Sequence, residues 1–267
     1  MIKFIKGVFG MKKLFSVVLA FLMIMGCMSI TSFADDASAT VYVSISNKGQ
    51  LVAAQAKVTV TDIDGDNALT VNDALYAAHE AAYSGGSKEG YSYYTHKDYG
   101  LSIGKLWGDT SGNFGYYINN SSCWSLADPV KNGDYLNAFV YSDSKNYSDK
   151  YCFFNNFTIT ADANSDIELT LSSAGYDANW NPVTLPVANA EITVDGKVTE
   201  VKTDANGKAT IQISGAGNHV ISAFSSSETL VPPVCTAQIN GGIIASVISA
   251  ITSFFSAIIS FILSIFA

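Results

Sequence analysis

Four aspartates recur in a short stretch of the chain at spacings suited to holding a hard metal ion. Asp62, Asp64 and Asp66 fall on alternate residues, and Asp73 follows at the twelfth position counted from Asp62. Calcium takes about six to eight oxygen ligands, and a tight turn with acids on alternate residues points their oxygens inward. The backbone carbonyl of Ala68 supplies a further oxygen. The stretch therefore predicts a calcium site made by these five residues.

The same stretch resembles the calcium loop of EF-hand proteins, and the aspartate at its last position makes it similar to bacterial dockerin-type loops. The sixth position usually holds glycine; here it is Asn67, which also tolerates a left-handed backbone. A dockerin carries two such loops, whereas one is visible in this sequence. The alternative interpretation is a helix cap made by Thr70 and Asp73 beside a solvated turn.

A helix is expected directly after the loop. Thr70 and Asp73 have the spacing of a capping box, in which each side chain satisfies a backbone N–H of the other residue. Apolar residues then recur at the spacing of one helix face, at Val71, Ala74, Leu75, Ala78 and Ala82. Gly85 and Gly86 end the pattern.

Aromatic residues are the second group with chemical potential, and most of the tyrosines and tryptophans fall between residues 91 and 151. Exposed rings bind sugars, peptides or flat cofactors through apolar area and a polar tip. Strand alternation predicts that one member of an adjacent tyrosine pair faces the core while its neighbour faces outward. We select Tyr94, Trp107, Tyr117 and Trp124 as candidate ligand-binding residues; packing is the alternative role for each.

The sequence offers no combination of residues typical of an enzyme. The three histidines, His79, His96 and His219, each have a structural explanation, and no flanking signature supports a nucleophile at Cys123 or Cys152. A bound cation would hold the loop acids ionised, which suits them poorly to general acid catalysis. Phosphate-loop and zinc-ligand spacings are also missing from the sequence. We therefore predict a protein without catalytic activity.

Residues 1–34 have the pattern of a secretory signal peptide. Lys12 and Lys13 precede an apolar run, and Ser32-Phe33-Ala34 is a small-x-small cleavage site. A lipid attachment site at Cys27 is the alternative. Cleavage after Ala34 removes four of the 15 basic residues and none of the 23 acidic ones, which leaves a net charge of 11 − 23, or −12. Such a surface repels nucleic acid and suits metal ions.

Three further cysteines remain in the exported chain. Cys123 and Cys152 fall in one predicted domain and could form a disulfide in an exporting compartment, or stay as small buried thiols. Cys235 is left over.

A run in the first domain resembles the transcobalamin C-terminal-like domain found in many bacterial surface proteins. The matching strings are Gly115-Tyr116-Tyr117-Ile118-Asn119, then Asp128-Pro129-Val130, then Asn132-Gly133-Asp134 before a hydrophobic strand. The resemblance implies a β-grasp-like sheet with one helix across it, and capture of a small ligand such as a corrinoid as an alternative function. The predicted domain covers residues 35–161.

A second, all-β unit is expected over residues 162–240. Short alternating strands and the Asn206-Gly207 turn, which we interpret as the centre of a hairpin, favour a β-sandwich. The strings around Pro186 and Thr203-Asp204 resemble bacterial immunoglobulin-like repeats, whose implied role is that of a stalk.

Residues 241–267 form an uncharged apolar tail. At about 1.5 Å per residue, a helix from residue 243 onward reaches roughly 37 Å, enough for a hydrocarbon core of about 30 Å. Its serines share one helix face: Ser246, Ser249, Ser253, Ser256, Ser260 and Ser264. Small residues on one face favour close helix packing, so self-association through this stripe is one hypothesis and a monomeric anchor is the other.

The sequence thus predicts a signal peptide, an α+β β-grasp-like head, an all-β immunoglobulin-like sandwich and a C-terminal hydrophobic helix that anchors the protein in a membrane. We expect a secreted, cell-surface binding or adhesion protein with calcium as its cofactor. The expected partner is an extracellular protein or glycan, not a nucleic acid.

Overall fold

The computed structural model of the chain describes residues 38–241, 251–252, 254–256 and 258. The predicted signal peptide at 1–34, with Cys27, lies outside these residues, and so does most of the predicted C-terminal anchor. Within the described ranges no helix combines the length and the hydrophobicity needed to cross a membrane.

Five strands form a first, mixed sheet. In spatial order they are β2 (Gln50–Thr61), β1 (Ser38–Asn47), β7 (Tyr135–Val140), β5 (Phe114–Ile118) and β6 (Ser121–Ser122). The β1 and β7 strands are parallel, while the other neighbours are antiparallel. Lys48 and Gly49 both have positive φ, the geometry of the tight turn that joins twisted strands.

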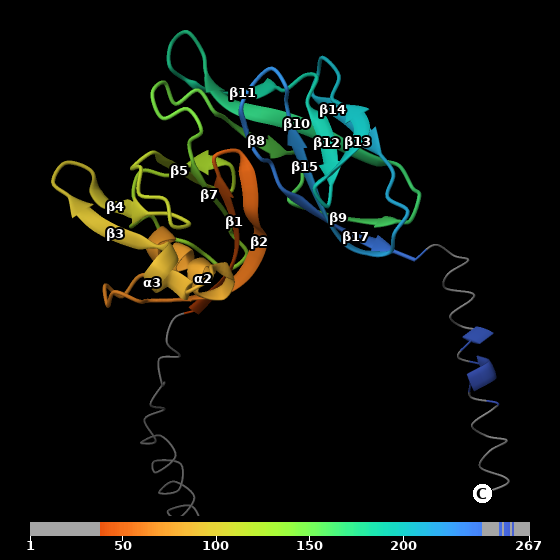
Figure 1. The fold of residues 1–267 in the computed structure, drawn as a ribbon, viewed down its shortest axis with the longest axis horizontal. Helices are drawn as coiled ribbons and strands as arrows, with labels where there is room; N and C mark the ends of the chain where they lie inside the picture. Colours follow the sequence, from red (N-terminus) through yellow and green to blue (C-terminus); the bar gives the residue numbers. More distant parts are fainter. Residues whose placement is uncertain (1–37, 242–250, 253, 257, 259–267) are drawn as a thin grey trace, which may run out of the picture. The chain divides into compact units, whose positions relative to one another are not determined.

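One face of this sheet is covered by helix α2 (Val71–Ala82) (Figure 1). Its buried residues Val71, Ala74, Leu75 and Ala78 pack in one apolar cluster with β1 residues such as Val43. Burying each larger aliphatic side chain stabilises the fold by about 1.5–3 kcal/mol. The apolar periodicity of the sequence therefore predicted this helix and four residues of its buried face, whereas Ala82, the fifth predicted residue, is exposed.

Two short elements follow α2. The helix α3 (Gly86–Gly90) leads into a separate two-stranded hairpin made by β3 (Ser92–His96) and β4 (Gly100–Lys105), which extends away from the sheet in Figure 1. We refer to the elements from β1 to β7 as the head.

The remaining strands form two sheets packed face to face, which we call the sandwich. The first sheet contains β11 (Pro182–Pro186), β10 (Ile167–Tyr176), β8 (Lys150–Phe154) and β16 (Leu230–Val231), with β14 (Lys208–Ile211) also paired to β10. The second contains β13 (Lys197–Lys202), β12 (Glu191–Val194), β15 (Gly217–Phe224), β17 (Cys235–Asn240) and β9 (Thr158–Asp162). Leu169, Leu171, Ile192, Ile221 and Ile239 share the apolar core between the sheets.

The turn at Asn206-Gly207 differs from its prediction as a hairpin. It joins β13 in one sheet to β14 in the other, so the chain crosses the sandwich here. Leu171 donates its N–H to the Gly207 carbonyl, and a Cβ at position 207 would lie 2.3 Å from the Leu171 carbonyl oxygen. Contact with β10 thus directs the turn, which local sequence cannot reveal.

The boundary expected between residues 161 and 162 also differs from the strand pairing. Strand β8 precedes that boundary and β9 spans it, yet they pair with β10 and β17 of the sandwich. Their apolar alternation is compatible with either sheet, so the sequence pattern alone could not assign them.

The head and the sandwich belong to one compact unit and are joined by buried polar contacts. Gln55 of β2 donates its side-chain amide to the carbonyls of Phe157 (2.9 Å) and Val234 (3.3 Å). Its Oε1 accepts a hydrogen bond of 2.8 Å from the Thr236 hydroxyl. Beside them, the Tyr135 and Phe157 rings stack with centroids 4.1 Å apart.

Candidate functional site

Three of the predicted calcium ligands converge. The carboxylates of Asp62, Asp64 and Asp66 offer oxygen atoms that all lie within 4.8 Å of one another. The two Asp62 oxygens accept the backbone N–H groups of Gly65 (2.7 Å) and Asn67 (2.8 Å), which folds the loop over this side chain. Asn67 has φ of +64°, the left-handed conformation that the sequence predicted at this position.

The pKa values of the loop carboxylates shift in different directions. Burial, followed by the negative charge of Asp66, raises the pKa of the Asp64 carboxyl. The backbone N–H of Asn67 lowers the pKa of Asp62. Asp64 also accepts a hydrogen bond of 3.0 Å from the amide of the fully buried Asn72, whose own oxygen accepts the Tyr91 hydroxyl (2.9 Å). A bound cation would offset the repulsion from Asp66, the second cause of the raised pKa of Asp64 after burial.

The structure does not bring Asp73 into this group. Asp73 is fully buried, and its carboxylate accepts the N–H groups of Ile63 (3.0 Å) and Thr70 (2.7 Å) and the Thr70 hydroxyl (2.6 Å). It thus forms the capping box that starts α2. Ala68 lies in the exposed loop, where its N–H donates to Asp66.

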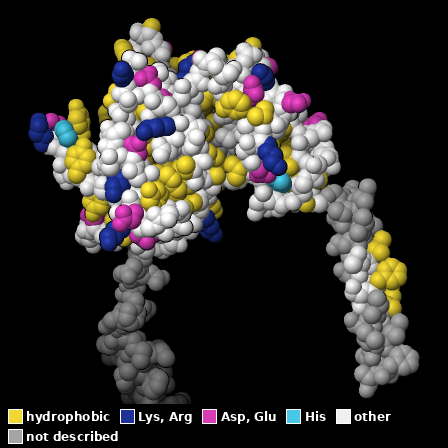
Figure 2. All heavy atoms as spheres, viewed as in Figure 1, with side chains coloured by type: hydrophobic (Ala, Val, Ile, Leu, Met, Phe, Trp, Pro, Cys, Tyr) yellow, Lys and Arg dark blue, Asp and Glu magenta, His cyan; other side chains and the backbone are white. Residues whose placement is uncertain are grey.

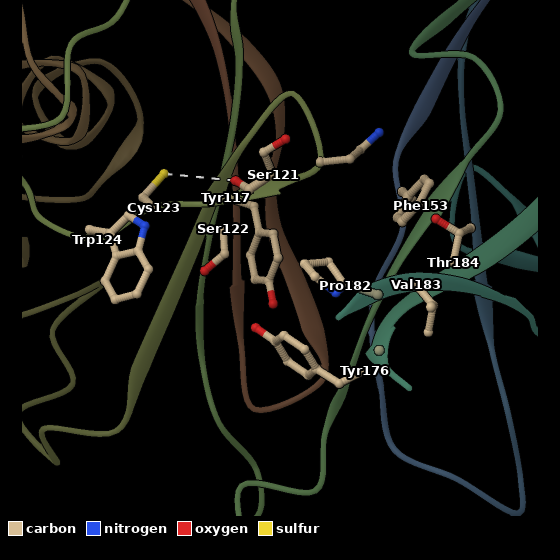
Figure 3. A pocket seen from close by; sticks show the side chains of 13 residues that line it. Tyr117, Ser121, Ser122, Cys123, Trp124, Phe153, Tyr176, Pro182, Val183 and Thr184 are labelled. Carbon is tan, nitrogen blue, oxygen red and sulfur yellow. Dashed lines mark hydrogen bonds between the residues drawn. The ribbon is translucent and has the colours of Figure 1, made fainter. Parts of the chain in front are cut away.

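A separate cleft of about 700 Å³ lies between the head and the sandwich. The turn after β5 and strand β6 form one wall, and strands β10 and β11 form the other (Figure 3). The head contributes Tyr117, Asn120, Ser121, Ser122, Cys123 and Trp124, and the sandwich contributes Phe153, Ala174, Gly175, Tyr176, Pro182, Val183 and Thr184. This volume falls in the range of small-ligand sites.

Tyr117, one of the candidate ligand-binding residues, is held firmly in this cleft. Its ring stacks on the buried Tyr151 ring with centroids 3.6 Å apart and an angle of 2° between the planes. The Tyr151 hydroxyl donates to Asn120 (3.0 Å) and accepts from the Asn137 amide (3.0 Å). Burial raises the pKa of Tyr117 to about 12, so its hydroxyl stays protonated at physiological pH.

Trp124, a second candidate, lines the same cleft with 93% of its surface exposed. The Asp128 carboxylate accepts the Trp124 backbone N–H at 2.7 Å and fixes the turn that presents the indole. The turn before it is fixed by Asn119, whose amide donates to Asp134 at 2.9 Å. Asn119, Asp128 and Asp134 belong to the strings that resemble the transcobalamin C-terminal-like domain. They thus hold the turns next to the cleft.

The sandwich wall was missed by sequence reasoning. Tyr176 and Trp180 are strongly exposed and their ring centroids lie 6.1 Å apart. Between them, Asp177 accepts the backbone N–H groups of Asn179 and Asn181, and Trp180 has φ of +63°. Trp180 is not among the lining residues, but a tryptophan between two asparagines is a signal that could have identified the exposed turn next to this wall.

The other two candidates lie elsewhere. Tyr94, about half exposed, is on the β3–β4 hairpin. Trp107 packs against the head core, where its backbone N–H donates to Nε2 of the buried His79 at 3.0 Å. Nδ1 of His79 lies 2.6 Å from the Leu75 carbonyl and donates to it, so the imidazole is neutral and structural.

The lining of the cleft carries no charged side chain among the residues described. Burial raises the pKa of Cys123 to about 12, which keeps this thiol protonated. Cys123, Cys152 and Cys235 are all free thiols, so the disulfide that the sequence left open between Cys123 and Cys152 is not formed. Figure 2 shows basic and acidic side chains scattered over the visible face, without a basic stripe.

Comparisons with known proteins do not assign a family. No protein-family model matches the chain, and no curated protein matches its sequence. Similar solved structures include the N-terminal four Ig domains of Dscam1 isoforms 4.44 and 4.4, each 10% identical and covering 76% of this chain. Their TM-scores are 0.23 and 0.21, and the match spans 44% and 43% of those chains. Such low scores carry no argument, and the all-β sandwich rests on the strand pairing described above.

Proposed function

We propose that this chain is an exported, non-catalytic cell-surface protein that binds an extracellular protein or glycan. The observation that carries this proposal is the uncharged cleft with exposed aromatic walls between the head and the sandwich. Trp124, with 93% of its surface exposed, is available to a partner, and aromatic anchors dominate the binding energy of many interfaces.

The chemistry of the lining supports binding over catalysis. General acid–base catalysis needs a group that titrates near the working pH. The Tyr117 hydroxyl and the Cys123 thiol both have their pKa raised to about 12 by burial. Neither group is a base or an activated nucleophile near pH 7.

Calcium is proposed as the cofactor of the head. Asp62, Asp64 and Asp66 fit a hard cation, whereas Asp73 is committed to the helix cap. An ion there neutralises the loop acids and, through Asp64 and Asn72, steadies the start of α2 and Tyr91. The role proposed for calcium is structural, because the ion would bind in the loop whereas the ligand would bind in the cleft.

Export and anchoring complete the proposal. Cleavage after Ala34 delivers the chain to the surface, the sandwich serves as an immunoglobulin-like stalk, and residues 241–267 tether it to the membrane. Self-association through the serine stripe remains a hypothesis. Capture of a small ligand such as a corrinoid by the head is the alternative function.

The test is a binding screen of the full chain in detergent against an array of immobilised glycans and peptides. We expect Trp124→Ala to weaken binding to every retained probe by at least about tenfold, the loss typical of an aromatic anchor. Tyr94→Ala, an exposed aromatic on the hairpin, is the matched control and should bind normally. Equal binding by Trp124→Ala and the wild type, or chemical conversion of a bound probe, would overturn the proposal.

A further inference from the structure

The cleft combines flat rings with small neutral hydrogen-bonding groups. Trp124 and Tyr176 offer exposed ring faces, and Asn120, Ser121 and Thr184 offer amide or hydroxyl groups along the same lining. Figure 3 shows Tyr117 and Tyr176 close together between Trp124 and the β11 residues. A ligand that fits such a lining has apolar faces for stacking and hydroxyl groups at its edges, as a sugar ring does.

The charged side chains in and around the cleft restrict the class of ligand that can bind there. The described lining has no lysine, arginine or histidine to neutralise an anion. Two aspartates stand beside it: Asp128 accepts the Trp124 N–H, and Asp177 follows Tyr176. With a formal chain charge of −8, the surroundings disfavour a phosphorylated or uronic acid ligand.

The backbone around the cleft disfavours an extended peptide. Strands β6 and β11 are the edges of their sheets, where a peptide could add as a further strand. However, β6 has only 2 residues, and β11 begins and ends with Pro182 and Pro186, which have no N–H to donate. Recognition at this cleft must therefore come from side chains.

Two parts of the lining are fixed in advance. Tyr117 is stacked on Tyr151, and Tyr176 is followed by the turn that Asp177 holds. Fixed rings lose little conformational entropy when a ligand binds. This preorganisation matters most for sugars, which gain little from each contact in water.

We infer that the cleft binds a short uncharged oligosaccharide, with the rings of Trp124 and Tyr176 stacking on sugar faces and Asn120 and Thr184 meeting its hydroxyl groups. The inference rests on the proposed binding function and specifies its ligand class. It adds the sandwich wall to the site, so neither the head nor the sandwich alone is sufficient.

The test is calorimetric titration of the full chain in detergent with defined probes. The neutral probes are cellohexaose, maltohexaose, mannohexaose, xylohexaose and chitohexaose; the others are hexagalacturonate and a soluble Ser/Thr/Val decapeptide. We expect at least one neutral probe to bind with an affinity insensitive to salt between about 0.1 M and 1 M.

The variants test which side chains make this site. Trp124→Ala and Tyr176→Ala should each raise the Kd of that neutral probe at least about tenfold, while Tyr94→Ala leaves it unchanged. Both cleft side chains are exposed, so unchanged thermal melts will show that the variants fold.

Binding of none of the neutral probes, or of hexagalacturonate or the peptide alone, would overturn the inference. If the peptide binds and Trp124→Ala abolishes that binding, the proposed function stands and the ligand class is wrong. If a neutral probe binds equally well to both cleft variants, the inference and the proposed function fall together.

Discussion

At the scale of single residues, Asp64 is the side chain that best tests whether the loop binds calcium or is a solvated turn. Its carboxylate lies with those of Asp62 and Asp66, and burial and the charge of Asp66 raise its pKa. It also contacts the buried Asn72, which connects the loop to the head core. An ion bound at this point would therefore stabilise the head core as well as the loop.

Replacing Asp64 with alanine should abolish stabilisation by calcium. In the wild type, calcium at a hundredfold excess over its Kd should add about 2.7 kcal/mol to the free energy of unfolding, because the ion binds only the folded loop. Thermal melts with calcium and with chelator measure the difference. Asp98→Ala, an exposed aspartate on the β3–β4 hairpin, should retain the full shift; loss of the shift in this control too would point to nonspecific charge effects.

His79 should make the protein less stable in acid. Burial lowers its pKa below the ordinary value of about 6.5. The rings around it belong to Tyr83, Tyr91 and Trp107, and no charged group is among them. The unfolded chain therefore binds more protons than the folded chain below about pH 6.5, and the free energy of unfolding falls as pH drops, by up to about 1.4 kcal/mol per unit.

Urea unfolding at pH 7.5 and pH 5 tests this expectation. His79→Gln should be less stable at pH 7.5 by about 1–3 kcal/mol, because it disturbs the bonds to Leu75 and Trp107, and should lose part of the pH dependence. His96→Gln, on the exposed hairpin, should behave as the wild type. An unchanged pH slope in His79→Gln would show that other groups cause the acid sensitivity.

The start of α2 shows, at the scale of elements, why the spacing of Asp73 predicts two roles for one side chain. Asp73 lies three residues after the cap and at the last position of the loop, so one side chain satisfies two sequence patterns. The structure places its oxygens on Ile63 and Thr70. Spacing alone could not decide between these roles, because both need a carboxylate at the same position.

Asp73→Ala should lower stability whether or not calcium is present. Losing the cap costs about 0.5–2 kcal/mol, and the buried N–H groups of Ile63 and Thr70 lose their acceptor. Thermal melts should therefore show the same drop with calcium and with chelator, in contrast to Asp64→Ala. A drop confined to calcium would instead make Asp73 a ligand.

Elements with strong local signals were predicted well, and those set by distant contacts were not. The capped helix follows from the spacing of its capping and apolar residues. The crossing at Gly207 and the placement of β8 depend on contacts with β10, which the sequence pattern does not contain. Among the candidate aromatics, the exposed Trp124 and the packed Trp107 have similar local sequence signals, and only tertiary packing separates them.

At the scale of the whole molecule, Gln55 joins the head to the sandwich. Its backbone has φ of +43° beside an irregularity in the β1–β2 register, which directs the side chain toward Phe157, Val234 and Thr236. The cleft also lies between the head and the sandwich, so its width depends on these hydrogen bonds of Gln55, which we call the joint. A pattern of residues along the chain cannot predict such pairing across nearly 180 positions.

Gln55→Ala should weaken the joint and the cleft together. Three hydrogen bonds of about 1 kcal/mol each are lost, so the free energy of unfolding should fall by about 2–3 kcal/mol. Scanning calorimetry should also show separate head and sandwich transitions in place of one. Gln50→Ala, at the exposed start of β2, is the control, and equal effects of the two changes would argue against the joint.

The most direct measurement of the binding proposal is hydrogen exchange of the full chain with and without a probe retained in the binding screen. A ligand in the cleft should slow exchange in two segments that are distant in sequence, residues 117–124 of the head and 174–184 of the sandwich. The hairpin at residues 92–105 should exchange at the same rate in both states. Protection of the hairpin, or of one wall without the other, would contradict a binding site built jointly by the head and the sandwich.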